Sequence, residues 1–216
     1  LDRQYFTPKS WRAKCYRFLD TWSCKLADMV LLDTQAHIDL FVNEFGLQRE
    51  KFKRVFVGTD SDVFYPRNID KNTDKFLIHF HGSYIPLQGV EYIIRAAKLL
   101  ENENVIFNLI GQGQTYKKDR QLAESLDIKN INFIERVASE KLPDYINMTD
   151  VSLGIFGDTP KTSLVIPNKI YEAIACAKPV ITADTSAVRE LFHDRGDIIL
   201  CNRADPVDLA KKIIEL

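Results

Sequence analysis

The sequence lacks a surplus of charge of either sign, because 29 basic side chains stand against 30 acidic ones and leave a formal charge of −1. A chain without a basic surplus has no overall field that would hold a polyanion, so we expect no nucleic-acid partner. It also lacks a signal-peptide pattern and any apolar run near the ~18–20 residues of a membrane-spanning helix. Because it begins at Leu1 without a Met, we expect a segment of a longer protein.

Cysteine is scarce as well. The four cysteines are Cys15, Cys24, Cys176 and Cys201, and they show neither CxxC spacing nor the density of a disulfide scaffold. We therefore expect buried thiols in a reducing compartment, which favours the cytoplasm. Apolar residues at 45% and charged residues at 27% are typical of a folded globular protein.

Apolar and amphipathic stretches alternate after residue 74. We expect strands at 75–81, 104–110, 131–135, 150–155, 179–182 and 197–201. We expect helices at 88–100, 114–126, 138–147, 167–177, 185–192 and 205–216. This alternation predicts βαβ units and a parallel sheet that is covered on both faces. The predicted fold class is α/β, a Rossmann-like doubly wound sheet whose ligand binds beyond the carboxyl ends of the strands.

The first third of the chain has its own pattern of elements. Apolar residues from about 9 to 26 share one helical stripe, and Met29–Asp33 is typical of a short buried strand. Thr34 is a candidate N-cap of a helix that Gly46 ends, and a second strand is expected near 54–57. Residues 67–74 are polar and without periodicity, which indicates a linker.

A loop bracketed by glycines follows the first strand of the larger unit. Gly82 and Gly89 permit a tight turn and the close approach of a phosphate to backbone N–H groups, although a plain strand-to-helix turn needs such glycines too. His79 and His81 lie on one face of the strand. A metal would need ligands beyond them that the sequence does not supply, so we expect no metal site and assign His81 to the lining of the pocket.

A GxG turn, Gly111 to Gly113, ends the second strand, and Glu135 follows about 20 residues later. This spacing is typical of a dinucleotide fingerprint and supports an NAD-dependent enzyme as a rival interpretation. The third glycine of that fingerprint is missing, however, and Tyr116 occupies a position where close packing favours a small residue.

The segment from Pro167 to Val180 begins a helix whose amino end can bind an anion. Pro167 suits the first helical position, and the exposed N–H groups that follow it attract negative charge. Lys169 lies in the first turn, where the helix dipole opposes its charge, so a diphosphate would compensate it. The alternative is an ion pair of Lys169 with Glu172, worth about 0.2–0.5 kcal/mol. Glu172 is placed to accept hydrogen bonds from a ribose diol.

These motifs, in this order, resemble the carboxy-terminal domain of family-four retaining glycosyltransferases with the GT-B fold, the enzymes that build bacterial surface polysaccharides. The resemblance rests on the Gly82 loop, the GxG turn, the NFIERV strand and the KIYEAIACAKPVI segment. VGTDSDVFYP at 57–66 resembles the hinge of that family. The resemblance implies that residues 1–66 are a remnant of the acceptor-binding domain plus the hinge, a partial second Rossmann-like domain. Residues 67–216 are then the donor-binding domain.

The resemblance also implies residue roles. Lys169 and Glu172 are assigned as the catalytic residues, with Glu172 on the nucleotide ribose. The donor-binding residues are His81, Gly82, Ser83, Gly111, Gly113, Glu135, Arg136, Val137, Asp158, Ile166, Pro167 and Asn168. Departures from the family pattern are Leu164, where the first glutamate of a pair is usual, and Ser83 and Gln88, where Arg and Lys are usual. Lys169 is the expected substitute cation, and Asp158 the candidate for the missing glutamate.

The expected function is therefore retaining transfer of a sugar to a saccharide or lipid-linked saccharide from a UDP-, GDP- or ADP-sugar, without a cofactor. The segment alone is expected to be inactive. A catalytically silent domain that binds sugar nucleotides is the second alternative, because of the departures at 83, 88 and 164. The aromatic and basic helix at 9–26 is expected to pack against the rest of its domain, and contact with the inner face of a membrane is the other interpretation.

Overall fold

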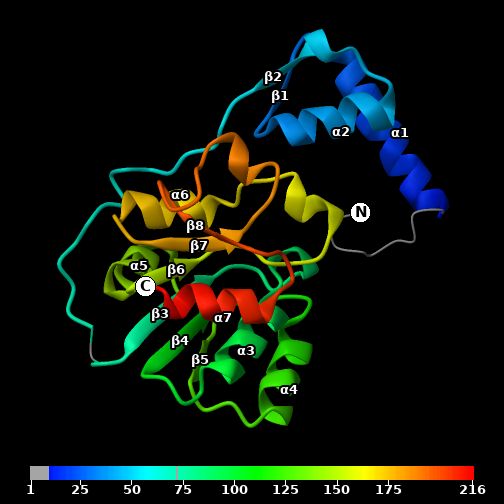
Figure 1. Cartoon of the computed structure of the whole chain (residues 1–216). Helices are drawn as coiled ribbons and strands as arrows, with labels where there is room; N and C mark the ends of the chain where they lie inside the picture. Colours follow the sequence, from blue (N-terminus) through cyan, green and yellow to red (C-terminus); the bar gives the residue numbers. More distant parts are fainter. Residues whose placement is uncertain (1–9, 72) are drawn as a thin grey trace.

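The computed structural model describes residues 10–71 and 73–216 and builds them around two parallel sheets (Figure 1). Among the described residues, β1 (Val30–Leu32) pairs with β2 (Phe52–Arg54) in a small sheet. The larger sheet has the order β5 (Ile131–Ile134), β4 (Val105–Ile110), β3 (Phe76–His81), β6 (Val151–Leu153), β7 (Val180–Ala183) and β8 (Ile199–Cys201). The predicted α/β class is confirmed.

The order of the larger sheet determines where a ligand is expected. Counted from its own first strand, the sheet has the order 3-2-1-4-5-6 of a doubly wound fold. Every strand pair is parallel, so all carboxyl ends meet at one edge. The order reverses between β3 and β6, and the crevice beyond such a switch point is the usual binding site in these sheets.

Helices cover both faces of the larger sheet (Figure 1). One face carries α3 (Val90–Leu99), α4 (Tyr116–Ser125) and α7 (Pro206–Ile214), whose apolar residues share a cluster with Phe80 and Phe107. The other face carries α5 (Leu142–Met148) and α6 (Asn168–Ala175), joined through Ile146 and Ile170. Phe80 and Phe107 are fully buried, and burial of each contributes about 1.5–3 kcal/mol to stability.

Several predicted elements differ in detail. The predicted helix at 185–192 is wrong, because only a short 3₁₀ turn forms at Val188–Glu190 and the backbone of Leu191 leaves the helical region at φ −125. The predicted helix at 88–100 begins later, at Val90, because Gly89 adopts a left-handed conformation with φ +66. Pro167 is the N-cap of α6, with extended backbone, and is not its first helical residue.

The amino-terminal part contains α1 (Trp11–Leu26) and α2 (Gln35–Phe45) beside β1 and β2. The predicted caps of α2 are confirmed: the Thr34 hydroxyl accepts the N–H of His37 at 3.1 Å, and Gly46 is left-handed. β2 lies a little earlier than the strand expected near 54–57. The first nine residues of the segment 1–66 and Asn72 of the predicted linker lie outside the described residues.

Surface exposure corrects the expectation for one cysteine. Cys15 is exposed, so only three of the four thiols are buried as predicted. The apolar stripe of α1 is not covered by described residues: Trp11, Phe18, Leu19, Trp22 and Leu26 are all exposed.

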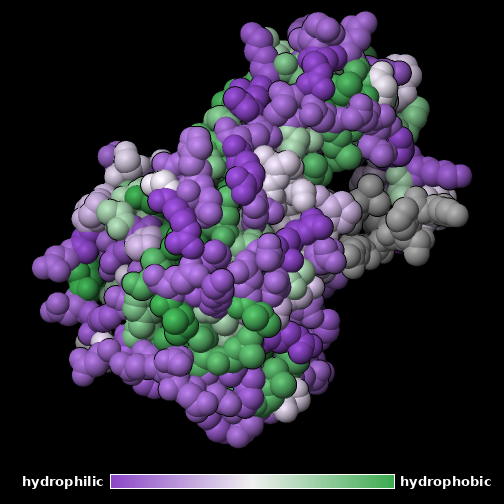
Figure 2. Space-filling model, in the orientation of Figure 1, coloured by the Kyte–Doolittle hydropathy of each residue, from purple (hydrophilic) through white to green (hydrophobic). Residues whose placement is uncertain are grey.

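Figure 2 shows a further apolar surface where α3 and α7 meet, and there Leu99, Val207 and Ile214 are exposed. Among the described residues, none of the helices combines the length and apolar character that crossing a bilayer requires.

Glu190 joins the amino-terminal part to the larger sheet. Its carboxylate accepts the N–H groups of Gln35 at 2.6 Å and Ala36 at 2.8 Å, the first two residues of α2. It also pairs with Arg54 at 3.0 Å. A helix leaves its first N–H groups without partners inside the helix, so Glu190 caps α2 from about 155 residues away along the chain.

Replacing Glu190 with Ala should lower the melting temperature by about 2–4 °C, because loss of such a cap costs about 1 kcal/mol. Differential scanning calorimetry measures this shift, and amide exchange in α2 should become faster. Glu101, which pairs with Lys98 on the surface, is the matched control, and Glu101→Ala should leave both readouts unchanged. Unaltered exchange in α2 after Glu190→Ala would show that the cap contributes nothing.

Candidate functional site

A pocket of about 550 Å³ opens at the carboxyl ends of β3, β4 and β5. It is lined by seven of the predicted donor-binding residues, which are His81, Gly82, Ser83, Gly111, Gly113, Arg136 and Val137. Ile110, Gln112 and Leu142 complete the lining. Residues from three separate loops thus meet at the edge of the sheet where a doubly wound fold binds its ligand.

Glycines allow the loops after β3 and β4 to touch. The backbone of Gly111 has φ +131, and a Cβ atom on it would lie 2.0 Å from the carbonyl oxygen of Gly82. The N–H of Gly82 in turn donates to the carbonyl of Ile110 at 3.0 Å. A Cβ on Gly113 would lie 2.7 Å from the backbone nitrogen of Tyr84. Because no side chain separates the loops, backbone atoms form the floor of the pocket.

Glu172 reaches this pocket from α6 through His81. The Nε2 atom of His81 lies 2.7 Å from Oε2 of Glu172, and its Nδ1 atom lies 2.9 Å from Nε2 of His79. Burial lowers the pKa of His81, and Lys169 lowers it further, whereas the hydrogen bond to Glu172 opposes the shift. Burial lowers the pKa of His79 well below its usual value. Both imidazoles are therefore neutral at neutral pH.

Lys169, also on α6, lies beside the Gly82 turn. Its Nζ atom lies 3.8 Å from the centre of the Phe80 ring and donates a hydrogen bond to Oε1 of Gln88. The same atom would be 3.0 Å from a Cβ on Gly82. Lys169 and Glu172 thus have partners in β3 and its loop instead of the alternative ion pair with each other. Burial lowers the pKa of Lys169 well below its usual value, although Glu172 opposes the shift.

The remaining predicted residues lie around or away from the pocket. Glu135 is exposed directly after β5, and Ile166 is buried in the cluster below α6. Pro167 and Asn168 form the amino end of α6, which no described side chain caps. Asp158 does not line the pocket: it pairs with Arg203 at 3.2 Å and lines a different hollow.

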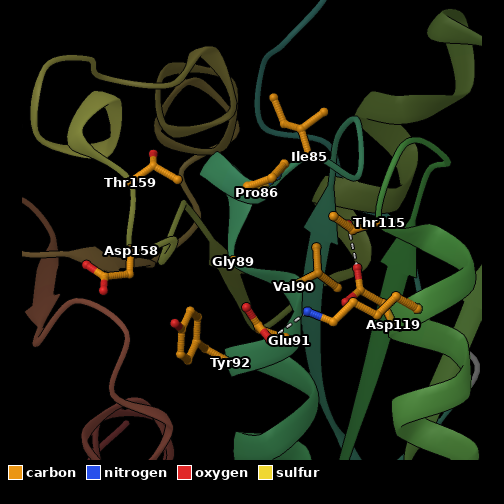
Figure 3. A pocket seen from close by; sticks show the side chains of 11 residues that line it. Ile85, Pro86, Gly89, Val90, Glu91, Tyr92, Thr115, Asp119, Asp158 and Thr159 are labelled. Atoms are coloured by element: carbon orange, nitrogen blue, oxygen red, sulfur yellow. Dashed lines mark hydrogen bonds and ion pairs between the residues drawn. The ribbon is translucent and has the colours of Figure 1, made fainter. Parts of the chain in front are cut away.

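That second hollow, of about 230 Å³, lies between α3, α4 and the 158–159 segment (Figure 3). Asp119 points into it and accepts a hydrogen bond from the Thr115 hydroxyl at 2.6 Å. Burial raises the pKa of Asp119 to about 6, with a contribution from Glu91, although Thr115 opposes the shift. The buried carboxylate therefore destabilises the fold at neutral pH.

Replacing Asp119 with Asn should raise the melting temperature at pH 7.5 by about 2–4 °C, the shift expected for about 1 kcal/mol. A folded-state pKa raised above the ordinary value of 3.8 means that the protonated form is favoured on folding. The stabilising contribution of the protonated Asp119 carboxyl is present at low pH and is lost as the pH rises through about 6. Thermal melts at pH 4 and 7.5 test this, because an equal gain at both would contradict the raised pKa.

Sequence reasoning missed two partners in the site. The sequence indicates His79 only as a candidate metal ligand. It indicates Gln88 only as a position where the usual Lys is missing. The signal for His79 is the pair of histidines on one face of a strand whose carboxyl end lies at the binding edge of the sheet. No His/Cys/Asp/Glu group suited to a metal ion occurs among the described residues.

The sequence model of the family described as Glycosyl transferases group 1 matches residues 63–216. An uncharacterized glycosyltransferase of Methanocaldococcus jannaschii is 26% identical over 162 residues, which cover 75% of this chain and 42% of that protein. The putative colanic acid biosynthesis glycosyl transferase WcaI of Escherichia coli K12 is 30% identical over 152 residues, which cover 69% of this chain and 37% of that protein. The chain thus spans less than half the length of these two curated relatives.

Solved structures show the same fold. HepE of Anabaena, whose crystal structure is in complex with UDP and glucose, superposes with a TM-score of 0.82 at 19% identity. The superposition covers 99% of this chain and 60% of that chain. The architecture, including the six-stranded parallel sheet, is that of the GT-B glycosyltransferases.

Proposed function

This chain belongs to the glycosyl transferases group 1 family, and we propose that it holds the nucleoside diphosphate sugar from which the whole protein transfers a sugar. The observation that carries the proposal is the pocket at the carboxyl edge of the sheet, which the Gly82 and Gly111 turns line and where Glu172 of α6 contacts the lining residue His81. An uncapped helix amino end and backbone N–H groups attract a diphosphate. Oε1 of Glu172 is available for a ribose diol, because His81 contacts Oε2.

The proposed reaction is transfer with retention of configuration to a saccharide or lipid-linked saccharide in the biosynthesis of a polysaccharide. Its support is the family and the names of two relatives, the colanic acid transferase of E. coli and a probable glycosyltransferase, WbjE, of Pseudomonas aeruginosa. The chemical task is to stabilise the charge of the departing diphosphate, which requires oriented donors and a cation more than a nucleophile. We assign this role to Lys169, because its Nζ atom lies beside the Gly82 turn.

We assign the acceptor to the part of the whole protein that precedes the hinge at 57–66. The chain spans less than half of its curated relatives, so we expect it to bind a donor but to turn over little or none alone. We infer that the exposed stripe of α1 packs against the rest of the acceptor-binding domain. We also infer that the protein works in the cytoplasm. Binding of the chain to anionic vesicles in a flotation assay would support a membrane contact instead.

A thermal-shift screen tests the proposal directly. UDP, GDP, ADP and their sugars are compared with NAD at equal concentration, because a ligand that binds only the folded form raises its stability, by about 2.7 kcal/mol at 100 times the Kd. One of the nucleoside diphosphates should give the largest shift. A larger shift with NAD than with every nucleoside diphosphate would favour the dinucleotide interpretation.

A catalytically silent domain is the second candidate, and one observation favours it. Leu164, at the position of the family's first glutamate, contacts the amino-terminal part through its carbonyl, which accepts a hydrogen bond from the Thr34 hydroxyl. Its side chain offers no hydrogen bond to a sugar. The full-length protein, given a donor that it binds and a matched acceptor, should release the nucleoside diphosphate. Binding of the donor without release would favour the silent domain.

A further inference from the structure

Two buried histidines connect the interior of the sheet to Glu172. The side chains of His79 and His81 point to the same face of β3, with 1% and 8% of their surfaces exposed. The contacts form a chain from Nε2 of His79 to Nδ1 of His81, at 2.9 Å, and from Nε2 of His81 to Oε2 of Glu172, at 2.7 Å. The remaining nitrogen, Nδ1 of His79, is buried and has no partner among the described residues.

The network permits one direction for the hydrogen bonds. An ionised Glu172 only accepts, so Nε2 of His81 carries the hydrogen and Nδ1 of a neutral His81 accepts. Nε2 of His79 must then donate, which leaves Nδ1 of His79 without a hydrogen. The opposite direction would require a protonated Glu172, because Nε2 of His81 would then carry no hydrogen. Nδ1 of His79 has no partner in either direction, so the ionised carboxylate sets the direction.

The surroundings keep both imidazoles neutral. The charged groups that face the two imidazoles are Lys169 and Glu172 of α6. On β3, the imidazoles of His79 and His81 face each other. Burial and Lys169 disfavour a second proton on either ring. Protonation of His81 would turn Nδ1 into a donor and set it against the N–H of His79, so the chain itself also opposes the charge.

We propose that His81 is a positioning residue that holds Oε2 of Glu172 and presents Oε1 to the ribose of the donor, while His79 fixes the tautomer of His81. This inference rests on the proposed function. Without His81, the Glu172 side chain is free to leave the orientation in which Oε1 faces the ribose. The histidines would thus keep the carboxylate in place for the diol.

Calorimetry with UDP and 2′,3′-dideoxy-UDP tests the functional part of this inference. His81→Leu should weaken UDP about tenfold, the loss expected when a hydrogen bond to a charged group is removed. It should leave dideoxy-UDP unchanged, because that probe lacks the diol. His81→Gln, which keeps a side-chain N–H donor, should recover most of the UDP affinity. The double variant with Glu172→Ala should bind UDP no more weakly than Glu172→Ala alone.

The outcomes separate the two claims. If the unaltered chain binds UDP in a manner that depends on Glu172, but His81→Leu weakens both probes equally or adds fully to Glu172→Ala, the positioning role is overturned. If neither UDP, GDP nor ADP binds the unaltered chain, the proposed function fails. Long-range ¹H–¹⁵N spectra of the ligand-free chain provide an independent check. Both rings should be Nε2–H tautomers that do not titrate between about pH 6 and 8, and an Nδ1–H tautomer at either ring would contradict the chain.

Discussion

Replacing Lys169 with Met should weaken the binding of a nucleoside diphosphate by about ten- to hundredfold and should raise the melting temperature. A hydrogen bond to a charged group is worth about 1.5–3 kcal/mol, which corresponds to this range of affinity. Stability should rise because Lys169 is only 5% exposed, so burial opposes its charged form, whereas Met keeps the length of the side chain without the charge.

The pH dependence gives a second signature of Lys169. Burial lowers the pKa of the amine in the free protein, and a bound diphosphate would raise it again. Proton uptake on binding means that affinity increases as the pH falls from the pKa of the complex toward that of the free protein. Calorimetry in two buffers of different ionisation enthalpy measures this uptake, which Lys169→Met should abolish.

Lys178 provides the matched control, because it lies after α6 and is partly exposed. Lys178→Met should leave both the affinity and the proton uptake unchanged. Equal losses in the two variants would indicate a general effect of charge, and an unaltered affinity in Lys169→Met would remove Lys169 from the diphosphate site.

Replacing Glu172 with Ala should weaken nucleotide binding at least tenfold, about 1.4 kcal/mol, while the fold is kept. The side chain of Glu172 contacts His81 and is 17% exposed, so its removal leaves no large cavity in the core. The loss should be confined to ribonucleotides, because the diol is the group that Glu172 is proposed to bind. Isothermal titration calorimetry gives the affinity, and the circular dichroism spectrum reports on the fold.

Glu103, an exposed residue before β4, is the control for a loss of negative charge. Glu103→Ala should bind like the unaltered chain. A Glu172→Ala variant that binds with unaltered affinity would exclude Glu172 from the site, and a variant that unfolds would be replaced by Glu172→Gln, which keeps the size of the side chain.

Much of the fold could be predicted because it depends on local signals. Thr34 and Gly46 mark the ends of α2, and the apolar run before Gly82 is long enough to define a buried strand. The helix predicted at 185–192 does not form. Its apolar residues suit a helix of any length, but the Thr185 hydroxyl accepts the N–H of Val188 and supports only a short turn.

The position of the candidate pocket could be predicted from the sequence, but the contacts between its residues could not. Parallel strands bring the Gly82 and Gly111 turns to one edge, and this follows from the pattern of elements. The contact between His81 and Glu172 joins residues 91 positions apart, and that of Lys169 with Gln88 joins residues 81 positions apart. Both depend on how α6 packs over β3, which no local pattern specifies. Asp158 lies in the hollow beside Tyr92 instead.

Crystals of this chain soaked with UDP would show whether the nucleotide binds beyond the carboxyl end of β3. We expect the diphosphate between the Gly82 turn and the amino end of α6, the ribose within hydrogen-bonding distance of Oε1 of Glu172, and the base beside Arg136 and Val137. UDP bound only in the hollow at Asp119, with the edge beyond β3 free of ligand, would contradict this expectation.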